Sequence, residues 1–250
     1  MDVKIIIQAR VGSTRLPQKV LLSFTENKSI LQIIIENLLQ SFSTDQIIIA
    51  TTTSAADDKL VEAVKEYKIK IYRGNERDVL SRFIECAQIF NAENIIRVCA
   101  DNPFLMPKFI EELIKEAEPS DDYLSYVFPD NTPIIKSHIG LFAEYTTLKA
   151  LKKVAELTDS LKYREHVTNY IYMNPEHFHI RYLEMPKELR NRRDIRLTVD
   201  SLEDFNTLKE LYKLLPAVTD ENFLQSLIFH IDSNLSIRNN MIKQINKYEK

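Results

Sequence analysis

The sequence has few of the residues that mark disulfide-rich, zinc-binding or glycine-rich proteins. Its 250 residues include three glycines and two cysteines. Two cysteines are too few for a disulfide framework or a zinc site, so we expect Cys86, in a predicted helix, and Cys99, in a predicted strand, to be buried thiols. With so few glycines, we expect Gly12, Gly74 and Gly140 each to stand where the backbone requires that residue.

Long apolar runs and an excess of one charge are also missing. The longest apolar runs, such as IIIENLL, are too short to cross a bilayer, and the first residues do not resemble a secretory signal. The 33 Lys and Arg nearly balance the 36 Asp and Glu, which gives a formal net charge of −3. We therefore expect a cytoplasmic protein with no nucleic-acid or membrane partner, in which any strong cationic field is local.

Strands and helices alternate in the first half of the chain. Apolar runs predict strands over 3–7, 46–52, 69–72 and 94–100, and amphipathic stretches predict helices over 29–40, 56–68, 76–90 and 107–118. Ser29 should cap the first helix, and Asp57 with Asp58 the second. Nearly continuous apolar strands between helices predict an α/β fold with a mainly parallel sheet that is covered on both faces.

The second half has a looser pattern. We predict strands over 123–128, 138–143, 178–185 and 195–199, and helices over 145–157, 163–173, 202–214 and 219–230. No repeat, linker or low-complexity segment interrupts the chain, so we expect residues 1–250 to form a single domain.

The loop after the first strand is rich in groups that bind anions. Within KIIIQARVGSTRLPQK (residues 4–19) it carries three cations, two hydroxyls and one glycine: Arg10, Arg15, Lys19, Ser13, Thr14 and Gly12. Ligands of open parallel sheets bind beyond the carboxyl ends of the strands, and these groups suit the oxygens of a polyphosphate. The loop lacks both the P-loop and the dinucleotide-binding glycine motifs. A merely solvated surface loop is the alternative.

Two distant segments, IRVCAD (96–101) and IRLTVD (195–200), share one pattern. Strand alternation would put Asp101 and Asp200 each at the end of a strand, where two carboxylates beside a cationic loop could hold Mg²⁺ against phosphate oxygens. The alternatives are structural. Asp200 with Glu203, or Ser201, could cap the next helix, and Asp101 could belong to a turn.

These residues resemble a known family. ARVGSTRLPQKVL resembles the amino-terminal signature of the cytidylyltransferases that activate sugar acids, including the acylneuraminate and 3-deoxy-manno-octulosonate enzymes. The closer resemblance is to the spore-coat polysaccharide biosynthesis protein F branch, through ATTTSAADDKL, YRGNERDVLSRF, RVCADNPF, YREHVTNYIY and IRLTVDSLEDF. The ordered matches run from residue 5 to about residue 205.

The resemblance implies a fold and an activity. The fold would be a Rossmann-like three-layer nucleotidyltransferase with a mostly parallel mixed sheet, in which 1–120 binds the nucleotide and 121–250 binds the acceptor and forms a homodimer. The activity would be Mg²⁺-dependent transfer of CMP from CTP to a sugar acid or sugar phosphate, with release of pyrophosphate, in surface glycan or polysaccharide biosynthesis. Use of another NTP, or a non-catalytic nucleotide-sugar-binding role, remains as an alternative.

The resemblance also implies roles for individual residues. The catalytic cations would be Arg10, Arg15 and Lys19, and the metal ligands Asp101 and Asp200. The nucleotide would be bordered by Ala9, Gly12, Ser13, Thr14, Thr51, Thr52, Arg73, Gly74 and Asn75. Glu165 and His166 would belong to the acceptor site, or else form a helix-surface pair. For Asn75 the alternative is a helix N-cap with Asp78 three residues on, and for the threonines a strand-end turn.

Two departures from the family pattern stand out. Gln18 replaces the usual glycine, so we expect a different loop conformation before Lys19, and KSHIGLFA (136–143) lacks the acidic residue typical of the spore-coat branch. Other candidate sites are weaker. His177 and His179 lack further zinc ligands, and the basic stretch 187–194 lacks the interleaved aromatic residues of an RNA site.

Overall fold

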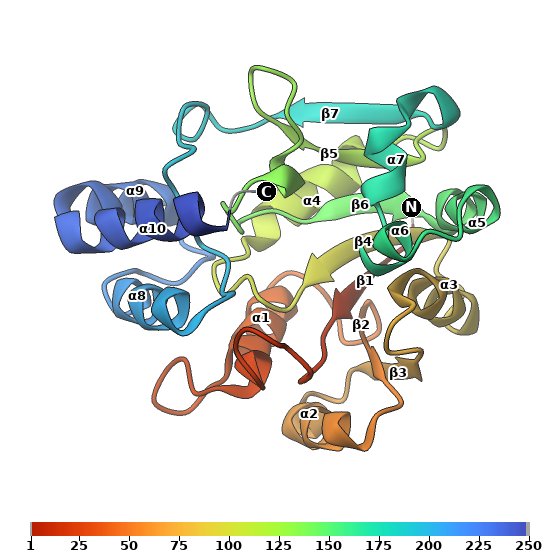
Figure 1. The fold of residues 1–250 in the computed structure, drawn as a ribbon, viewed down its shortest axis with the longest axis horizontal. Helices are drawn as coiled ribbons and strands as arrows, with labels where there is room; N and C mark the ends of the chain where they lie inside the picture. The colour runs from red at the N-terminus through yellow and green to blue at the C-terminus, as the bar shows by residue number, and fades with distance from the viewer. Residues whose placement is uncertain (1, 249–250) are drawn as a thin grey trace.

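The fold is an α/β arrangement around one mixed sheet. A computed structural model describes residues 2–248, and within them seven strands pair in the order β3-β2-β1-β4-β6-β5-β7 (Figure 1). The strands are β1 (Val3–Gln8), β2 (Ile47–Thr52), β3 (Lys70–Gly74), β4 (Asn94–Cys99), β5 (Tyr123–Val127), β6 (Glu144–Thr147) and β7 (Ile180–Glu184). All pairings are parallel except those of β6, which runs antiparallel to β4 and β5. The predicted mostly parallel mixed sheet is confirmed.

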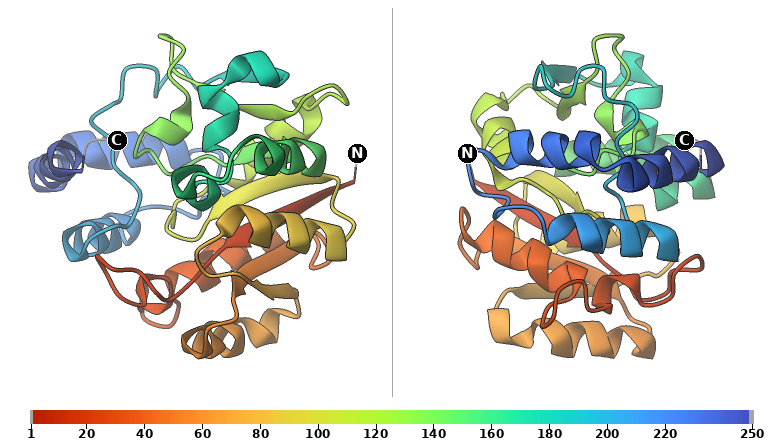
Figure 2. Two further views of the ribbon diagram at one scale, coloured as in Figure 1. Left: turned by 45° about the vertical axis from the view of Figure 1, so that its right-hand side comes forward. Right: turned by 90° about the vertical axis from the view of Figure 1, so that its left-hand side faces the viewer.

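Helices cover both faces of this sheet (Figures 1 and 2). They are α1 (Ile30–Leu39), α2 (Asp58–Val64), α3 (Val79–Ile89), α4 (Pro107–Glu116), α5 (Leu148–Leu157), α6 (Leu161–Glu165), α7 (Asn169–Met173), α8 (Leu202–Tyr212), α9 (Phe223–Ser233) and α10 (Leu235–Lys247). Buried residues of α1, α2, α4, α8, α9 and α10 share one core, and those of α3, α5 and α7 share the other. None of the helices within residues 2–248 is long and apolar enough to cross a membrane.

The apolar run of β1 explains how one strand serves both cores. Ile5 and Ile7 point to the first core and Ile6 to the second, and all three are fully buried. Successive strand residues face opposite sides, so a strand covered on both faces must be apolar throughout. The polar loop that follows β1 is thereby fixed at the carboxyl edge of the sheet.

The helix starts agree with the sequence at one predicted cap and differ at another. Ser29 caps α1 and forms a capping box with Gln32, as expected. The side chain of Asp57, in contrast, makes no capping hydrogen bond to α2. Its buried carboxylate instead accepts hydrogen bonds from the Val11 amide and from the hydroxyl of Thr51 (3.0 Å), so it ties the first loop to the end of β2.

The predicted strand over 138–143 is wrong, because the strand is β6 (Glu144–Thr147), which takes up the first residues of the helix predicted over 145–157. Gly140 has φ +60°, which breaks the extended run, and a side chain there would meet the backbone of Leu197 at 3.0 Å. Pairing with β4 and β5 then recruits the β-forming residues 145–147 as strand, and α5 begins only after its N-cap, Thr147.

Four other parts of the chain differ from the sequence prediction. Residues 195–199 are not a strand; Leu197 and Val199 donate amide hydrogen bonds to His138 and Asp101 without a continuous ladder. The helix predicted over 163–173 is split into α6 and α7 by Val167, whose φ of 45° is left-handed. The helix predicted over 219–230 is α9, shifted to 223–233, and α10 was missed.

Candidate active site

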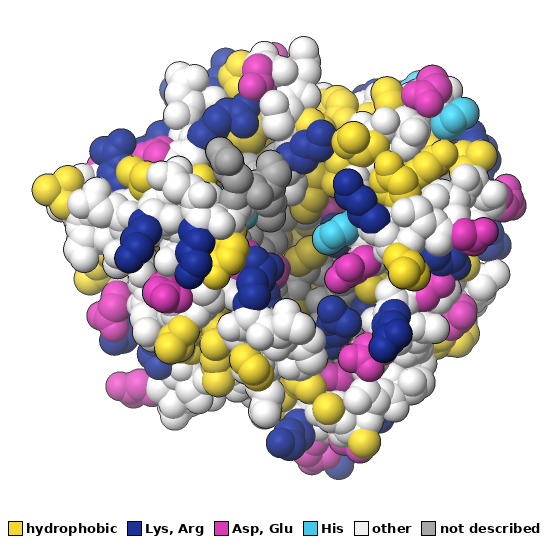
Figure 3. Space-filling view, viewed as in Figure 1, with side chains coloured by type: hydrophobic (Ala, Val, Ile, Leu, Met, Phe, Trp, Pro, Cys, Tyr) yellow, Lys and Arg dark blue, Asp and Glu magenta, His cyan; other side chains and the backbone are white. Residues whose placement is uncertain are grey.

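A cleft of about 730 Å³ opens at the carboxyl edge of the sheet. The residues that line it include Arg15, Asp101, Asp200, Glu144 and His166. Figure 3 shows a hollow near the middle of one face, with Lys and Arg side chains gathered around it. The position agrees with the general rule for ligand sites of open parallel sheets.

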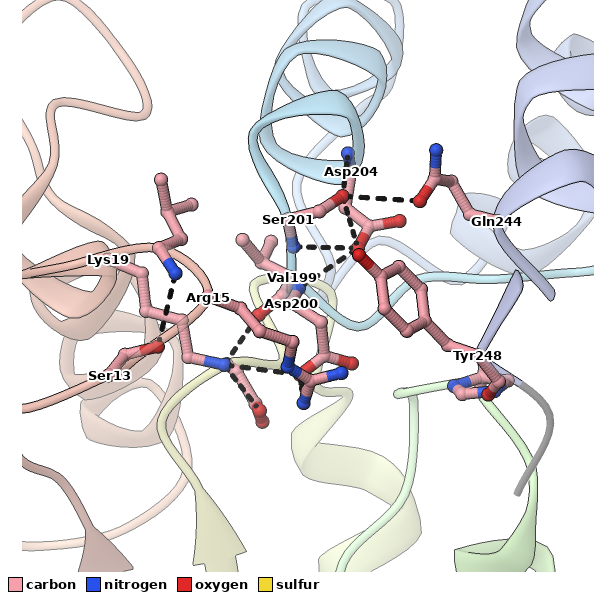
Figure 4. Close-up of polar contacts among 12 residues, drawn as sticks. Ser13, Arg15, Lys19, Val199, Asp200, Ser201, Asp204, Gln244 and Tyr248 are labelled. Atoms are coloured by element: carbon pink, nitrogen blue, oxygen red, sulfur yellow. Dashed lines mark hydrogen bonds and ion pairs between the residues drawn. The ribbon is translucent and has the colours of Figure 1, made fainter.

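Lys19 joins the two carboxylates that end IRVCAD and IRLTVD. It begins a single 3-10 turn (Lys19–Leu21), and its Nζ lies 2.9 Å from Asp101 Oδ2 and 3.5 Å from Asp200 Oδ1 (Figure 4). The same nitrogen donates a 2.6 Å hydrogen bond to the Val199 carbonyl. Burial opposes the charge on Lys19, but the carboxylates of Asp101 and Asp200 outweigh it and raise the lysine pKa.

Asp200 is held on both of its oxygens. Arg15 donates to Oδ1 at 2.8 Å, and Arg196 donates to Oδ2 at 3.1 Å. Arg196 is almost fully buried and also pairs with Asp204 through bonds of 2.6 and 2.8 Å. Although burial works in the opposite direction, this guanidinium lowers the pKa of the Asp204 carboxyl.

Of the two residues that the sequence offered as cap of the helix after Asp200, the structure confirms Ser201. Ser201 is the N-cap of α8, and its capping-box partner is Asp204 rather than Glu203. The Asp200 carboxylate turns toward Arg15 and Lys19.

Gln18 occupies the left-handed region, with φ 58° and ψ 19°. Its amide donates to the Val11 carbonyl (3.0 Å), and its carbonyl accepts from Leu21 (2.8 Å). Glycine adopts this region at no steric cost, so the glutamine keeps a conformation suited to the glycine that it replaces. The turn that follows Gln18 brings Lys19 to the carboxylates of Asp101 and Asp200.

The rest of the loop packs against the start of α3. Arg10 donates to the Glu76 carbonyl at 3.4 Å and lies 3.9 Å from Glu165. A side chain at Gly12 would lie 3.3 Å from Glu76 Oε1, so the loop passes close to this residue. Ala9 is buried and bonded to β2, whereas the side chains of Ser13 and Thr14 lie nearer the surface.

The residues expected around the base and ribose are mostly engaged with one another. Thr51 and Thr52 are buried, and both hydroxyls donate to Asp57. Arg73 donates to the Thr52 carbonyl at 2.8 Å and pairs with Asp58 at 2.6 Å. These contacts shape the end of β2, and none of Thr51, Thr52 and Arg73 is among the residues that line the cleft.

Gly74 and Asn75 form the turn into α3. A side chain at Gly74 would clash with Tyr72 at 2.7 Å. Asn75 is not the helix N-cap; its Oδ1 accepts from the amides of Arg77 and Asp78, each at 2.9 Å, and Asp78 is the N-cap. The alternative assignment of Asn75 as N-cap is therefore wrong by three residues.

The inner end of the cleft contains a buried ion pair that the sequence analysis missed. Glu144 lies directly opposite Arg97 in the β6–β4 register, and the two form a salt bridge with 2% and 7% of their side chains exposed. Glu144 also accepts from the hydroxyls of Tyr123 (2.5 Å) and Thr168 (2.9 Å). Burial, and then Glu144, raise the pKa of Tyr123 well above its usual value, so this phenol donates.

Glu165 and His166 differ in position. His166 lines the cleft, whereas the Glu165 side chain is 56% exposed and faces Arg10. The weaker histidine candidates stay weak: His177 lies beside Glu176 and His179 beside Asp121. Residues 2–248 contain no cluster of three or more His, Cys, Asp or Glu able to hold a metal.

Residues 4–233 match the family described as cytidylyltransferase. The chain belongs to the cytidylyltransferase family. It is 33% identical over 220 residues to the spore coat polysaccharide biosynthesis protein SpsF of Bacillus subtilis (strain 168), covering 85% of this chain and 87% of that protein. These matches confirm the family resemblance seen in the motifs and identify the chain as a nucleotidyltransferase.

Solved cytidylyltransferase structures share the fold. A cytidylyltransferase from Leptospira borgpetersenii serovar Hardjo-bovis (strain JB197) superposes with a TM-score of 0.83 at 31% identity, over 96% of this chain and 98% of that one. CMP:2-keto-3-deoxy-manno-octonic acid synthetase, solved in complex with CTP, gives a TM-score of 0.59 at 17% identity, over 85% and 99% of the chains.

Proposed function

We propose that this cytidylyltransferase transfers CMP from CTP to a sugar acid or sugar phosphate in a Mg²⁺-dependent reaction, for surface glycan or polysaccharide biosynthesis. The observation that carries the proposal is the meeting of Lys19 with Asp101 and Asp200, which brings one cation and two carboxylates from three distant segments to one point. We further propose that residues 1–120 hold the nucleotide, that 121–250 hold the acceptor, and that the protein is a cytoplasmic homodimer.

The donor set fits magnesium. Asp101 and Asp200 offer hard carboxylate oxygens, and two such residues suit an ion that usually keeps several waters and takes the rest of its ligands from phosphates. Zinc or calcium would call for more ligands from the protein. Asp101 and Asp200 would hold the ion, and when bound it would supply neutralising charge to the phosphates.

The loop cations would exchange partners when nucleotide binds. In the ligand-free arrangement Arg15 and Lys19 are paired with Asp101 and Asp200. Phosphate oxygens offer the same cations equivalent charge-assisted bonds, so the carboxylates become available without leaving the cations unpaired. The cost of separating the ion pairs is thereby offset within the site.

The residues then act by positioning and charge stabilisation. Lys19 would donate to an oxygen of the α-phosphate, while Arg10, Arg15 and the hydroxyls of Ser13 and Thr14 would bind the outer phosphates. The acceptor oxygen forms a bond to the α-phosphorus as the bond to the bridging oxygen breaks, and pyrophosphate leaves. The hydroxyl proton of the acceptor passes to solvent.

The part of the cleft beside Lys136, Lys162 and His166 would take the acceptor. These three exposed residues line the cleft, and the buried Glu144–Arg97 pair also borders it. Cationic side chains at this position favour an acceptor that carries a carboxylate or phosphate group. The sugar-acid name of the structurally similar synthetase points to the same class of acceptor.

The test is a release assay for pyrophosphate with each of the four NTPs and a panel of sugar acids and sugar phosphates. CTP with one acceptor should give turnover, and Lys19→Ala and Asp101→Asn should each reduce it at least 100-fold, since one preorganised charge contributes about that much. Lys213→Ala, which removes an exposed lysine paired with Glu210, is the matched control and should keep normal rates. Preference for another NTP would refute the assignment of CTP. Nucleotide binding without turnover on any acceptor would favour the alternative, a non-catalytic nucleotide-sugar-binding role.

A further inference from the structure

Tyr248 brings an element outside the recognised motifs into the active-site cleft. It follows α10 directly, its amide donates to the Gln244 carbonyl at 3.1 Å, and the residue lines the cleft beside Asp200. Gln244 is buried, and its side chain accepts from the hydroxyl of Ser201. The end of α10 is therefore anchored one residue away from Asp200 (Figure 4).

The main chain of Tyr248 is fixed by a second connection. His138 Nδ1 lies 2.7 Å from Arg196 NH1, and His138 Nε2 lies 2.9 Å from the Tyr248 carbonyl. A guanidinium can only donate, so Nδ1 accepts, and the proton on Nε2 is donated to the carbonyl. Tyr248 is thus linked through one imidazole to the arginine that holds Asp200.

The ring of Tyr248 contacts both arginines of the Asp200 site. Its centroid lies 5.2 Å from Arg15 Cζ and 5.5 Å from Arg196 Cζ, within the range of a cation–π interaction. Arg15 bonds one oxygen of Asp200 and Arg196 bonds the other. The ring therefore touches the two guanidinium groups that together set the orientation of this carboxylate.

We propose that Tyr248 is a positioning residue that keeps Arg15 in the cleft when Asp200 turns to the metal. The inference rests on the proposed function, in which Arg15 exchanges Asp200 for phosphate. The Arg15 side chain is 49% exposed and long, so ordering it costs conformational entropy. A ring that holds the guanidinium independently of Asp200 lowers that cost at the moment of exchange.

The test compares side chains that differ in one property at position 248. Tyr248→Leu keeps apolar cover over Arg196 but removes the π face, and we expect a rise of about 2–5-fold in KM for CTP and in Kd for Mg·CTP, equal to about 0.5–1 kcal/mol. The KM for the acceptor should not change. Tyr248→Phe keeps the ring and should restore the wild-type value. Leu235→Ala, on an exposed residue at the other end of α10, is the control for helix damage.

A double-mutant cycle separates positioning from general stabilisation. If Tyr248 acts through Arg15, Tyr248→Leu should have no further effect on Mg·CTP affinity in an Arg15→Ala background. The same 2–5-fold loss in both backgrounds, or no loss in either, would overturn the proposal. Calorimetric binding needs no acceptor. A wild-type protein that binds Mg·CTP but lacks turnover would refute the proposed function alone. A wild-type protein that does not bind Mg·CTP would refute both the proposed function and the positioning role of Tyr248.

Discussion

The buried pair of Glu144 and Arg97 allows a quantitative test of the fold around the cleft. The change is Glu144→Gln, which keeps the shape of the side chain and its contacts with Tyr123 and Thr168 but removes the charge. Arg97 is then left as a buried cation without its counter-charge, since 7% of its side chain is exposed. Removing one partner of a buried pair costs about 3–5 kcal/mol.

The expected loss of unfolding free energy can be measured as a fall in the melting temperature. For a chain of this length each kcal/mol corresponds to about 2–4 °C, so Glu144→Gln should lower Tm by about 6–20 °C in a calorimetric scan. Glu210→Gln removes an exposed partner of Lys213 and should cost less than about 1 kcal/mol. The double variant Glu144→Gln, Arg97→Met should recover much of the loss, because it leaves no unpaired charge and keeps an acceptor for the hydroxyls of Tyr123 and Thr168.

The result that would refute this reasoning is a Glu144→Gln protein within about 1 kcal/mol of wild type. Such tolerance would mean that water or a neighbouring group neutralises Arg97, and that the pair does not fix the end of β6. Failure of the double variant to recover stability would instead place the cost in packing rather than in charge.

Three further predictions concern Gln18, Asp204 and the metal. Gln18→Gly should raise the free energy of unfolding by about 0.5–1 kcal/mol, because glycine relieves the left-handed strain. Lower stability in urea unfolding would contradict this. The control Gln40→Gly, at a residue with φ −70°, should lower the free energy of unfolding. Asp204→Asn should flatten the fall of stability below pH 3.8, since the lowered pKa of Asp204 contributes stability above that value and loses it as the pH falls through the folded pKa; an unchanged acid profile by circular dichroism would contradict this. Chelation by EDTA should stop pyrophosphate release and added Mg²⁺ should restore it, whereas EDTA-resistant turnover would contradict the metal assignment.

The sequence predicts the first half of the fold well because its signals are local. Strands such as β1 contain a continuous apolar run, Ile5 to Ile7, and Ser29 marks the start of α1. In the second half tertiary pairing overrides local preference. Residues 145–147 become strand because β4 and β5 lie on either side, and Val167 ends α6 in a conformation that no propensity scale assigns to valine.

The candidate site also contains residues that local patterns predict and residues that only the tertiary structure reveals. Lys19, Asp101 and Asp200 were predictable because each ends a recognisable pattern at the carboxyl edge of the sheet. Glu144 and Tyr248 were not, because their place depends on which distant segment meets them. A charged residue inside an apolar stretch, as in LFAEYTT, is the one sequence signal that could have flagged Glu144. For Tyr248, the last turn of a missed helix, the sequence offers no comparable signal.

The ion pairs of Arg15 and Lys19 with Asp101 and Asp200 also predict that Mg²⁺ and CTP strengthen each other's binding. Mg²⁺ alone would meet carboxylates whose oxygens already bond Lys19 and Arg15, and it would offer these cations no replacement. CTP alone would draw Lys19 and Arg15 away from Asp101 and Asp200, and it would bring the negative charge of its phosphates close to both carboxylates. Each ligand should therefore bind weakly by itself and strengthen the binding of the other, by reciprocal coupling. Calorimetric titrations of Mg²⁺ with and without CTP should differ by at least about tenfold in affinity, roughly 1.4 kcal/mol. Equal affinities in the two titrations would mean that the metal does not compete with Lys19 and Arg15, and the exchange of partners would have to be abandoned.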